Sequence, residues 1–282
     1  MSQADEERDL QDATKDTVSL SHSPANAAEA FQLADACGGS LQHRLDVYSG
    51  YSRYFYPKTN QVYDEIIGQL RSPTKVGPQV GSVMPNFVLP DQNGSLTRLD
   101  FLLANGPVVI SLNRGHWCPW CRLQLRALAQ IHDDVRRLSG EVISIMPETG
   151  AYSRKAVEDN KLPFRILTDL DFGYTLSLGM VIWVEKLRDL YLSSGLDLPR
   201  FQNNGGWFLP VPATFVVGVD GTVKARFADP DFRKRMEPRD ILAALTLIRT
   251  DPNASAGDAR SGAVSGRVEQ PLAVRRRKQK TS

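Results

Sequence analysis

The apolar residues in the middle of the chain follow two alternating periods. PVVISLNR at 107–114 and EVISIMP at 141–147 are nearly continuous apolar runs, which are typical of strands covered on both faces. Between these runs, apolar residues recur at helical spacing from Leu123 to Val135. Three shorter patterns follow, which predict a helix at 153–160, a strand at 163–169 and a helix at 171–179.

Two predicted hairpins flank this alternation. PNFVLPDQNGSLTRL at 85–99 contains Asn93-Gly94, a dipeptide favoured in tight turns between strands. PATFVVGVDGTVKARFADP at 212–230 has a turn at Asp220-Gly221, and a last helix is predicted at 237–249. Strands that alternate with helices and end in a hairpin indicate an α/β fold, with a mixed central sheet and helices on both faces.

The pattern changes on either side of this principal domain, which we assign to residues 76–250. Residues 25–75 carry apolar positions at helical spacing, with breaks at Gly38-Gly39 and Pro57, and predict an N-terminal extension of two or three helices. Residues 1–24 form an acidic tail, and residues 251–282 form a tail that ends in the basic run RRRKQK. The first tail has hardly any large apolar groups, and residues 251–270 are rich in Ala, Gly, Ser and Asp, so we expect both tails to be disordered.

Net charge and the length of the apolar runs bear on two classes of partner, nucleic acids and membranes. The formal net charge of +2 is close to balance, so it gives no reason to expect a nucleic acid partner. No apolar run is long enough to span a membrane, and the acidic N-terminus lacks the features of a secretory signal. We therefore expect a soluble, cytoplasmic protein without a membrane partner.

The main candidate for chemistry is the pair Cys118 and Cys121 in RGHWCPWC, where a predicted strand leads into a predicted helix. Zinc needs about four ligands, usually from two close pairs, and the sequence has no second pair of cysteines or histidines. A buried structural pair is a further alternative. We predict a redox centre, without a metal or an organic cofactor.

A redox role follows from the position of the pair at the start of a helix. Unpaired backbone N–H groups and the helix dipole stabilise a thiolate there, so we expect Cys118 to have a low pKa and to act as the nucleophile. Cys121 lies one helical turn further on. It can therefore attack the product that forms on Cys118 and close a disulfide with it.

Five neighbours complete the predicted site. Arg114 and His116 can add positive charge near the thiolate, and Trp117, with the second tryptophan of the motif, can shield the thiols from water. Pro119 suits the first turn of a helix, where its missing N–H does no harm. Pro212 directly precedes a predicted strand, and a cis bond between Val211 and Pro212 would fit that position.

Two motifs carry a family resemblance. The pattern G-x-x-x-P-x-F-x-L-P-D-x-x-G at 81–94 and R-G-x-W-C-P-x-C at 114–121 together resemble the peroxiredoxin-like branch of the alkyl hydroperoxide reductase and thiol-specific antioxidant superfamily. The resemblance covers about residues 76–250 and implies a thioredoxin-like fold. It also implies a thiol peroxidase in which Cys118 attacks a hydroperoxide, Cys121 resolves the sulfenic acid as a disulfide, and thioredoxin or a similar dithiol restores the enzyme.

The chain departs from the family pattern at two positions. Peroxiredoxins usually carry Thr or Ser three residues before the peroxidatic cysteine, where this chain has Gly115, and an arginine where it has Pro212. Arg114 is the nearer replacement for that arginine, and Arg165 is a more distant one. If Cys121 is the peroxidatic residue instead, Cys118 occupies the Thr position and the two thiols exchange roles.

Two other function classes stay open from the sequence. One is a thiol-disulfide oxidoreductase that uses the same C-x-x-C pair. The other is a non-catalytic redox-sensing module that recruits a partner through the N-terminal helices. A cluster of aromatic residues in those helices favours self-association, for example as a homodimer; its members are Tyr48, Tyr51, Tyr54, Phe55 and Tyr56.

Overall fold

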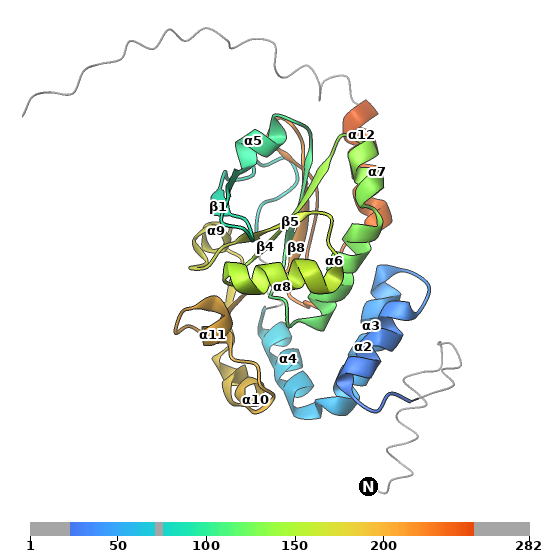
Figure 1. Cartoon of the computed structure of the whole chain (residues 1–282), viewed down its shortest axis with the longest axis vertical. Coiled ribbons are helices and arrows are strands. Elements are labelled where there is room, and N and C mark those ends of the chain that lie inside the picture. Colours follow the sequence, from blue (N-terminus) through green and yellow to red (C-terminus); the bar gives the residue numbers. More distant parts are fainter. Residues whose placement is uncertain (1–22, 71–75, 251–282) are drawn as a thin grey trace, which may run out of the picture.

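A computed structural model describes residues 23–70 and 76–250 of the chain (Figure 1). The residues predicted to form the two tails therefore lie almost entirely outside the described residues. Helices and strands alternate through the middle of the chain as the sequence predicts. The elements are α2 Ala27–Ala36, α3 Leu41–Phe55, α4 Pro57–Leu70, β1 Val88–Pro90, β2 Leu96–Arg98, α5 Leu99–Leu103, β3 Val108–Leu112, α6 Pro119–Gln130, α7 His132–Arg137, β4 Glu141–Met146, α8 Gly150–Asn160, β5 Arg165–Thr168, α9 Gly173–Ser177, β6 Val181–Trp183, a short 3₁₀ helix Glu185–Leu187, α10 Arg188–Ser193, α11 Leu198–Gln202, β7 Phe208–Pro210, β8 Ala213–Val217, β9 Val223–Ala228 and α12 Pro238–Thr250.

The centre of the fold is a five-stranded mixed sheet in the order β5-β4-β3-β8-β9. Strands β3, β4 and β5 are parallel to one another, whereas β8 and β9 run antiparallel to their neighbours. Every residue of β3 and β8 is buried, which explains why these strands read as continuous apolar runs.

Helices cover both faces of this sheet, as the sequence predicts for a thioredoxin-like fold. On one face, Val109 and Val142 pack with side chains of α6, α7, α8 and α12. On the other face, Ile110 and Ile143 pack against α5, α9 and the segment around Met84. The β1–β2 hairpin closes at the predicted turn, where Gly94 has a φ of +87° that favours glycine.

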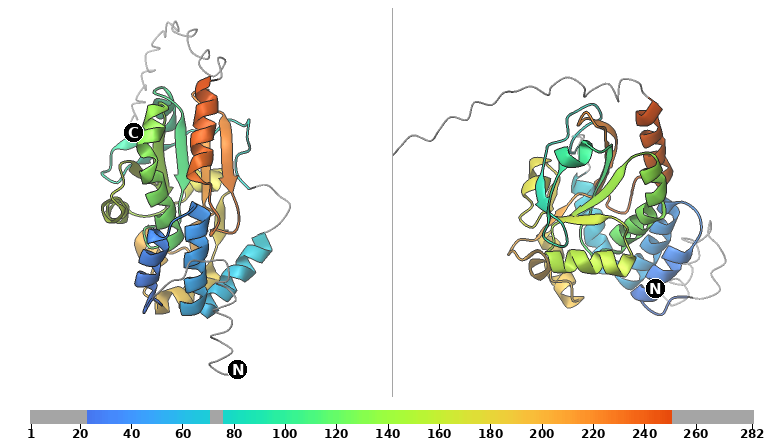
Figure 2. Two further views of the ribbon diagram at one scale, coloured as in Figure 1. Left: turned by 90° about the vertical axis from the view of Figure 1, so that its right-hand side faces the viewer. Right: turned by 45° about the horizontal axis from the view of Figure 1, so that its top comes forward.

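The N-terminal extension forms the three helices α2, α3 and α4, at the end of the sheet opposite α5 (Figures 1 and 2). Helix α6 is buried on two sides because these helices cover the side that the sheet does not. Its Leu125 and Leu128 face the sheet, while Trp120 and Leu123 belong to the cluster that includes the N-terminal helices. The first turn of α6 is therefore enclosed by protein.

Three features differ from the sequence prediction. The helical pattern from Leu123 to Val135 is divided into α6 and α7, because Ile131 leaves the helical conformation with φ −99° and ψ 3°. The region 181–210, for which we predicted no elements, contains the β6–β7 pair and the short helices α10 and α11. The bond between Val211 and Pro212 is trans, so the cis bond considered for it is wrong.

Glu237 connects the two ends of the described chain. Its carboxylate accepts hydrogen bonds from the backbone N–H groups of Leu41 and Gln42 at 3.1 and 2.7 Å, at the start of α3. A carboxylate there satisfies donors that have no partner within the helix and interacts favourably with the helix dipole. This contact joins α3 to the segment just before α12.

We predict that Glu237→Ala lowers the free energy of unfolding by about 1 kcal/mol, a typical loss for a helix cap. Urea denaturation of the full chain measures this change. Glu158→Ala, which removes an exposed carboxylate from α8, is the control and should leave the midpoint nearly unchanged. Equal midpoints for the two variants would contradict the role given to Glu237.

Candidate redox site

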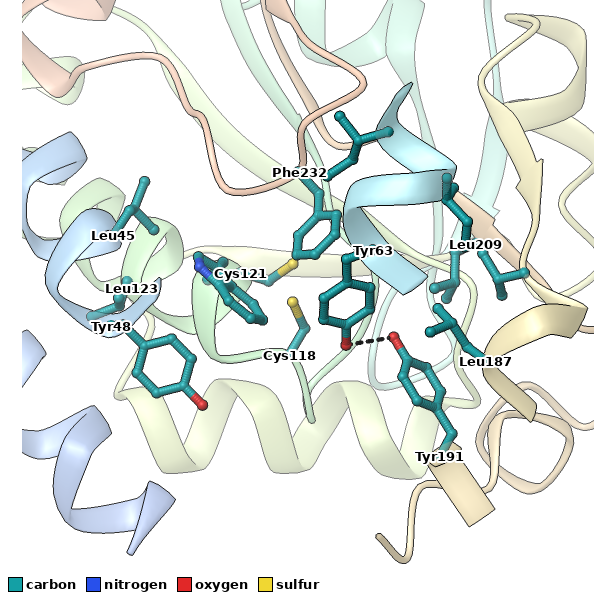
Figure 3. Close-up of a cluster of buried hydrophobic side chains, with 14 of the residues drawn as sticks. Leu45, Tyr48, Tyr63, Cys118, Cys121, Leu123, Leu187, Tyr191, Leu209 and Phe232 are labelled. Carbon is teal, nitrogen blue, oxygen red and sulfur yellow. Dashed lines mark hydrogen bonds between the residues drawn. The ribbon is translucent and has the colours of Figure 1, made fainter. Parts of the chain in front are cut away.

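The site lies where β3 ends and α6 begins. After Leu112, the chain passes through a buried turn to Cys118, which is the N-cap residue of α6, and Pro119 occupies the first helical position as predicted. Cys121 follows in the first turn of the helix. Both cysteine side chains are 0% exposed. Figure 3 shows their sulfur atoms side by side between aromatic rings.

Three hydrogen-bond donors converge on the sulfur of Cys121. The backbone N–H of Arg114 donates to it at 3.4 Å, and the guanidinium of Arg235 donates to it at 3.6 Å. The thiol of Cys118 is also hydrogen-bonded to it. Two of these donors belong to arginines, so the environment of this sulfur favours negative charge.

Cys121 is consequently the acidic thiol of the pair. Burial alone raises its pKa, but the hydrogen bond from Cys118, the charges of Arg235 and Arg114 and the Arg114 backbone N–H outweigh burial and bring the pKa to about 6. A free cysteine has a pKa of about 8.5. Cys121 is therefore a thiolate at neutral pH.

The pKa of Cys118 shifts in the opposite direction, whereas the sequence predicts Cys118 to be the low-pKa thiol. Burial, the hydrogen bond that it gives to Cys121 and the negative charge on Cys121 raise its pKa well above the ordinary value. The position at the helix start does not compensate, since its side chain makes no capping hydrogen bond to the helix backbone. The exchange of roles that the sequence left open is the arrangement that these electrostatics favour.

The guanidinium of Arg114 is enclosed by aromatic rings and is 2% exposed. It lies 4.0 Å from the ring centre of Phe232 and 5.2 Å from that of Trp117. Its Nη2 donates to the hydroxyl of Tyr191 at 2.6 Å, and that oxygen is 2.9 Å from the hydroxyl oxygen of Tyr63. In the described part of the chain, no carboxylate forms an ion pair with Arg114. Its uncompensated charge is therefore available to the neighbouring thiolate.

Aromatic side chains also shield the thiols from water. Trp120 is 3% exposed and packs edge-on against Tyr48, Tyr63 and Phe232, with ring centres 5.0–6.2 Å apart. Its indole N–H donates to Ser49 of α3 at 2.9 Å. Tyr48 of the predicted self-association cluster is thus used within the chain, and self-association stays a prediction.

His116, predicted to add positive charge near the thiolate, is paired with Glu148 in the structure. Its Nδ1 lies 2.8 Å from Glu148 Oε1, and its backbone N–H donates to Glu148 Oε2 at 2.7 Å. Glu148 is fully buried, so this pair fixes the turn before the cysteines. Gly115 has φ +153°, and a Cβ there would lie 2.7 Å from Glu148 Oε1 and 2.5 Å from Trp117 Nε1. Glycine is required here by close packing.

Of the other residues considered from the sequence, Pro212 lies at the same end of the sheet as the two cysteines and Arg165 lies at the opposite end. Pro212 is buried just before β8, beside Ala213, which pairs with Leu112 at the end of β3; it therefore lies at the same end of the sheet as the cysteines. Arg165 begins β5 at the opposite end of the strands and pairs with Glu141, so it does not replace the family's arginine. Cys37 is the residue that follows α2, and its thiol donates to the Ala34 carbonyl.

Sequence reasoning missed Arg235, Tyr63, Tyr191 and Glu148. Arg235 comes from FRKRMEPRD, where it is one of four arginine and lysine residues and nothing in the spacing distinguishes it. The two tyrosines are 128 positions apart and meet only in the folded chain. Glu148 carried a usable signal, because it follows a buried strand that ends beside the strand before the cysteines.

The described residues contain neither a metal-binding cluster nor a membrane-spanning helix. No group of three His, Cys, Asp or Glu side chains within 23–70 and 76–250 is arranged to hold a metal ion. In the same ranges, no helix combines the length and apolar character needed to cross a membrane.

Comparison with known proteins points to one family. The model of the AhpC/TSA family matches residues 80–226, just over half of the chain. Chloroplastic peroxiredoxin Q of Triticum aestivum is 32% identical over 89 residues, which is 32% of this chain and 41% of that protein. A putative chloroplastic peroxiredoxin Q of Oryza sativa subsp. indica matches to the same extent. The chain thus spans about two fifths of the length of these relatives.

Two solved structures are similar over a larger part of the chain. Peroxidoxin BcpB of Mycobacterium tuberculosis aligns with a TM-score of 0.49 and 20% identity, over 61% of this chain and 99% of that one. A cysteine-to-serine mutant of the peroxiredoxin 6 of Arenicola marina aligns with a TM-score of 0.49 and 20% identity, over 60% and 73% of the two chains.

We predict that the thiolate absorbance of the reduced protein titrates with a midpoint near pH 6. Arg235→Gln removes a positive charge beside the Cys121 sulfur, so it should move the midpoint upward to roughly pH 7. Ultraviolet absorbance during a pH titration measures this change.

Arg239→Gln is the matched control, because it removes the same charge from an exposed position four residues away. Its midpoint should equal that of the unmodified protein. A midpoint near pH 6 in Arg235→Gln would contradict the role of this arginine.

Proposed function

Since the chain belongs to the AhpC/TSA family, we propose that it is a thiol peroxidase that reduces hydrogen peroxide or organic hydroperoxides with Cys121 and Cys118. The observation that carries this proposal is the convergence of Cys118, the Arg114 backbone and Arg235 on the sulfur of Cys121. A thiolate attacks peroxides, whereas a thiol does not, and this convergence maintains a thiolate at neutral pH.

In the first step, the Cys121 thiolate attacks the outer oxygen of the hydroperoxide. The O–O bond breaks, the sulfur becomes a sulfenic acid, and the alkoxide leaves as an alcohol, or as water in the case of hydrogen peroxide, after it takes a proton. Negative charge moves from the sulfur to the leaving oxygen during this step. The buried guanidinium groups of Arg114 and Arg235 lie close enough to stabilise that charge in a dry site.

In the second step, Cys118 resolves the sulfenic acid. Its sulfur attacks the sulfur of Cys121, a disulfide forms, and hydroxide leaves as water with the proton of the Cys118 thiol. The two side chains are hydrogen-bonded in the reduced state, so this step needs little rearrangement. Two electrons have then passed from the thiols to the peroxide.

An external thiol must return both cysteines to the reduced state. The sequence resemblance names thioredoxin or a similar dithiol for this step. A thiol-disulfide oxidoreductase that acts on protein substrates is a weaker proposal, because such an enzyme presents a sulfur at its surface and both sulfurs here are 0% exposed. A purely sensing role does not account for the low pKa of Cys121.

We predict that Cys118→Ser still reacts with one equivalent of peroxide and accumulates a sulfenic acid on Cys121. Cys121→Ser should lose the fast reaction, because the remaining thiol has a raised pKa. Mass spectrometry after trapping with a sulfenic-acid reagent identifies the oxidised residue, and stopped-flow mixing gives the rate.

Cys37→Ser is the control and should react like the unmodified protein, since Cys37 lies outside the site. Trapped sulfenic acid on Cys118 would exchange the two roles. A reaction no faster than that of free cysteine in all variants would exclude the peroxidase.

A further inference from the structure

The charge of Arg235 reaches Cys121 from a segment that forms neither a helix nor a strand. This segment, the loop 229–237, connects β9 to α12. Most of its side chains are buried, namely those of Asp231, Phe232, Arg233, Arg235 and Met236. Buried backbone without regular structure needs hydrogen-bond partners elsewhere in the protein. The position of Arg235 therefore depends on what the loop 229–237 contacts.

One side chain of α3 holds the backbone of this loop through two hydrogen bonds. The Nε2 of Gln42 donates to the Arg233 carbonyl at 3.3 Å, and its Oε1 accepts from the backbone N–H of Arg235 at 3.4 Å. Asp46, one turn further along α3, also accepts from the Nε2 of Gln42 at 2.8 Å, which fixes the orientation of the amide. The backbone of Arg235 is thus tied directly to the N-terminal helices.

An ion pair from α4 holds the same loop. The guanidinium of Arg233 lies 2.9 Å from Asp64 Oδ1, and Asp64 also pairs with Arg53. Burial raises the pKa of the Asp64 carboxyl, but hydrogen bonds from Arg53 and Arg233 and their charges outweigh burial and hold the pKa below its usual range. Asp64 is therefore ionised over the whole pH range in which a cysteine titrates.

Aromatic packing joins the loop to the thiol site. The ring centre of Phe232 lies 4.9 Å from that of Tyr63 and 5.1 Å from that of Trp120. Figure 3 shows the Phe232 ring beside the sulfur of Cys121. The Phe232 carbonyl accepts a hydrogen bond from the guanidinium of Arg235, whose Nη2 lies 3.6 Å from the Cys121 sulfur. A displaced loop would therefore carry this guanidinium away from the sulfur.

We propose that Gln42 and Asp64 are positioning residues that hold Arg235 against the sulfur of Cys121, so that the N-terminal helices control the charge at the reactive thiol. This inference rests on the proposed function, which makes Cys121 the reactive thiolate. Residues 42 and 64 and the loop 229–237 all lie outside the family match at 80–226. The matched domain therefore does not supply this control of its own thiol.

The sign of the effect separates positioning from direct electrostatics. A negative charge raises the pKa of a nearby thiol, so loss of the Asp64 charge lowers the pKa of Cys121 if Asp64 acts only through its own field. Loss of Asp64 raises that pKa if it releases Arg233 and lets Arg235 move away. Gln42 carries no charge, so a shift on its removal reports a change of position.

The experiment measures the thiolate absorbance of the reduced full chain during a pH titration. We expect Gln42→Ala to raise the midpoint by about half a pH unit, part of the shift expected when the Arg235 charge is lost. Asp64→Asn should also raise the midpoint, against the sign of its own charge. Gln32→Ala, which removes an exposed amide from α2, and Glu65→Gln, which removes an exposed carboxylate from α4, are the controls and should not raise it.

The same substitutions in the Arg235→Gln background test whether both residues act through that arginine. Gln42→Ala and Asp64→Asn should add no upward shift there, because the charge that they position is gone. An unchanged or lower midpoint in either single variant would overturn the inference. An upward shift of equal size in the Arg235→Gln background would overturn it as well.

The rate of reaction with peroxide keeps this inference separate from the proposed function. The expected shifts in a protein that reacts no faster than free cysteine would support the positioning residues and reject the peroxidase. Absent shifts in a protein that reacts rapidly would reject the positioning residues and leave the peroxidase in place.

Discussion

The arrangement of the site depends on the burial of the Arg114 guanidinium, which has no carboxylate partner within residues 23–70 and 76–250. Removing a cation from water costs several kcal/mol, and a protein tolerates it only with compensating interactions. Here the compensation comes from aromatic faces, from the hydroxyl of Tyr191 and from the sulfur of Cys121. A carboxylate in this position would neutralise the arginine and leave the thiolate without support. The thiolate is therefore part of the charge balance that keeps Arg114 in the interior.

This constraint makes the N-terminal helices part of the site. Tyr63 of α4 is hydrogen-bonded to Tyr191, which in turn holds Arg114, and Ser49 of α3 holds the indole of Trp120. The family match covers residues 80–226 and includes neither Tyr63 nor Arg235. The cysteine motif therefore comes from the shared domain, whereas part of its enclosure and one of its two cations come from segments outside the match.

The sequence predicted what depends on local periodicity and short motifs. The sheet, its covering helices, the hairpin turns and the start of a helix at Pro119 all follow from spacing and turn residues, and the structure has them. It could not predict which cysteine is acidic, because that depends on Arg235, which is 114 positions from Cys121. A local rule, the helix dipole, favoured Cys118, and longer-range charges and hydrogen bonds outweighed it. Gly115 departs from the family pattern for a reason that is visible only in three dimensions, the close approach of Glu148.

A dry site has two opposite consequences for a thiol catalyst. Excluding water strengthens the attraction between the thiolate and the two arginines, because the effective dielectric constant falls. The same exclusion raises the pKa of any thiol that has no such partners, as it does for Cys118. One enclosure thus separates the acidities of two chemically identical side chains that lie a single turn apart. Access is the cost, because every reactant must pass the aromatic layer to reach the two sulfurs.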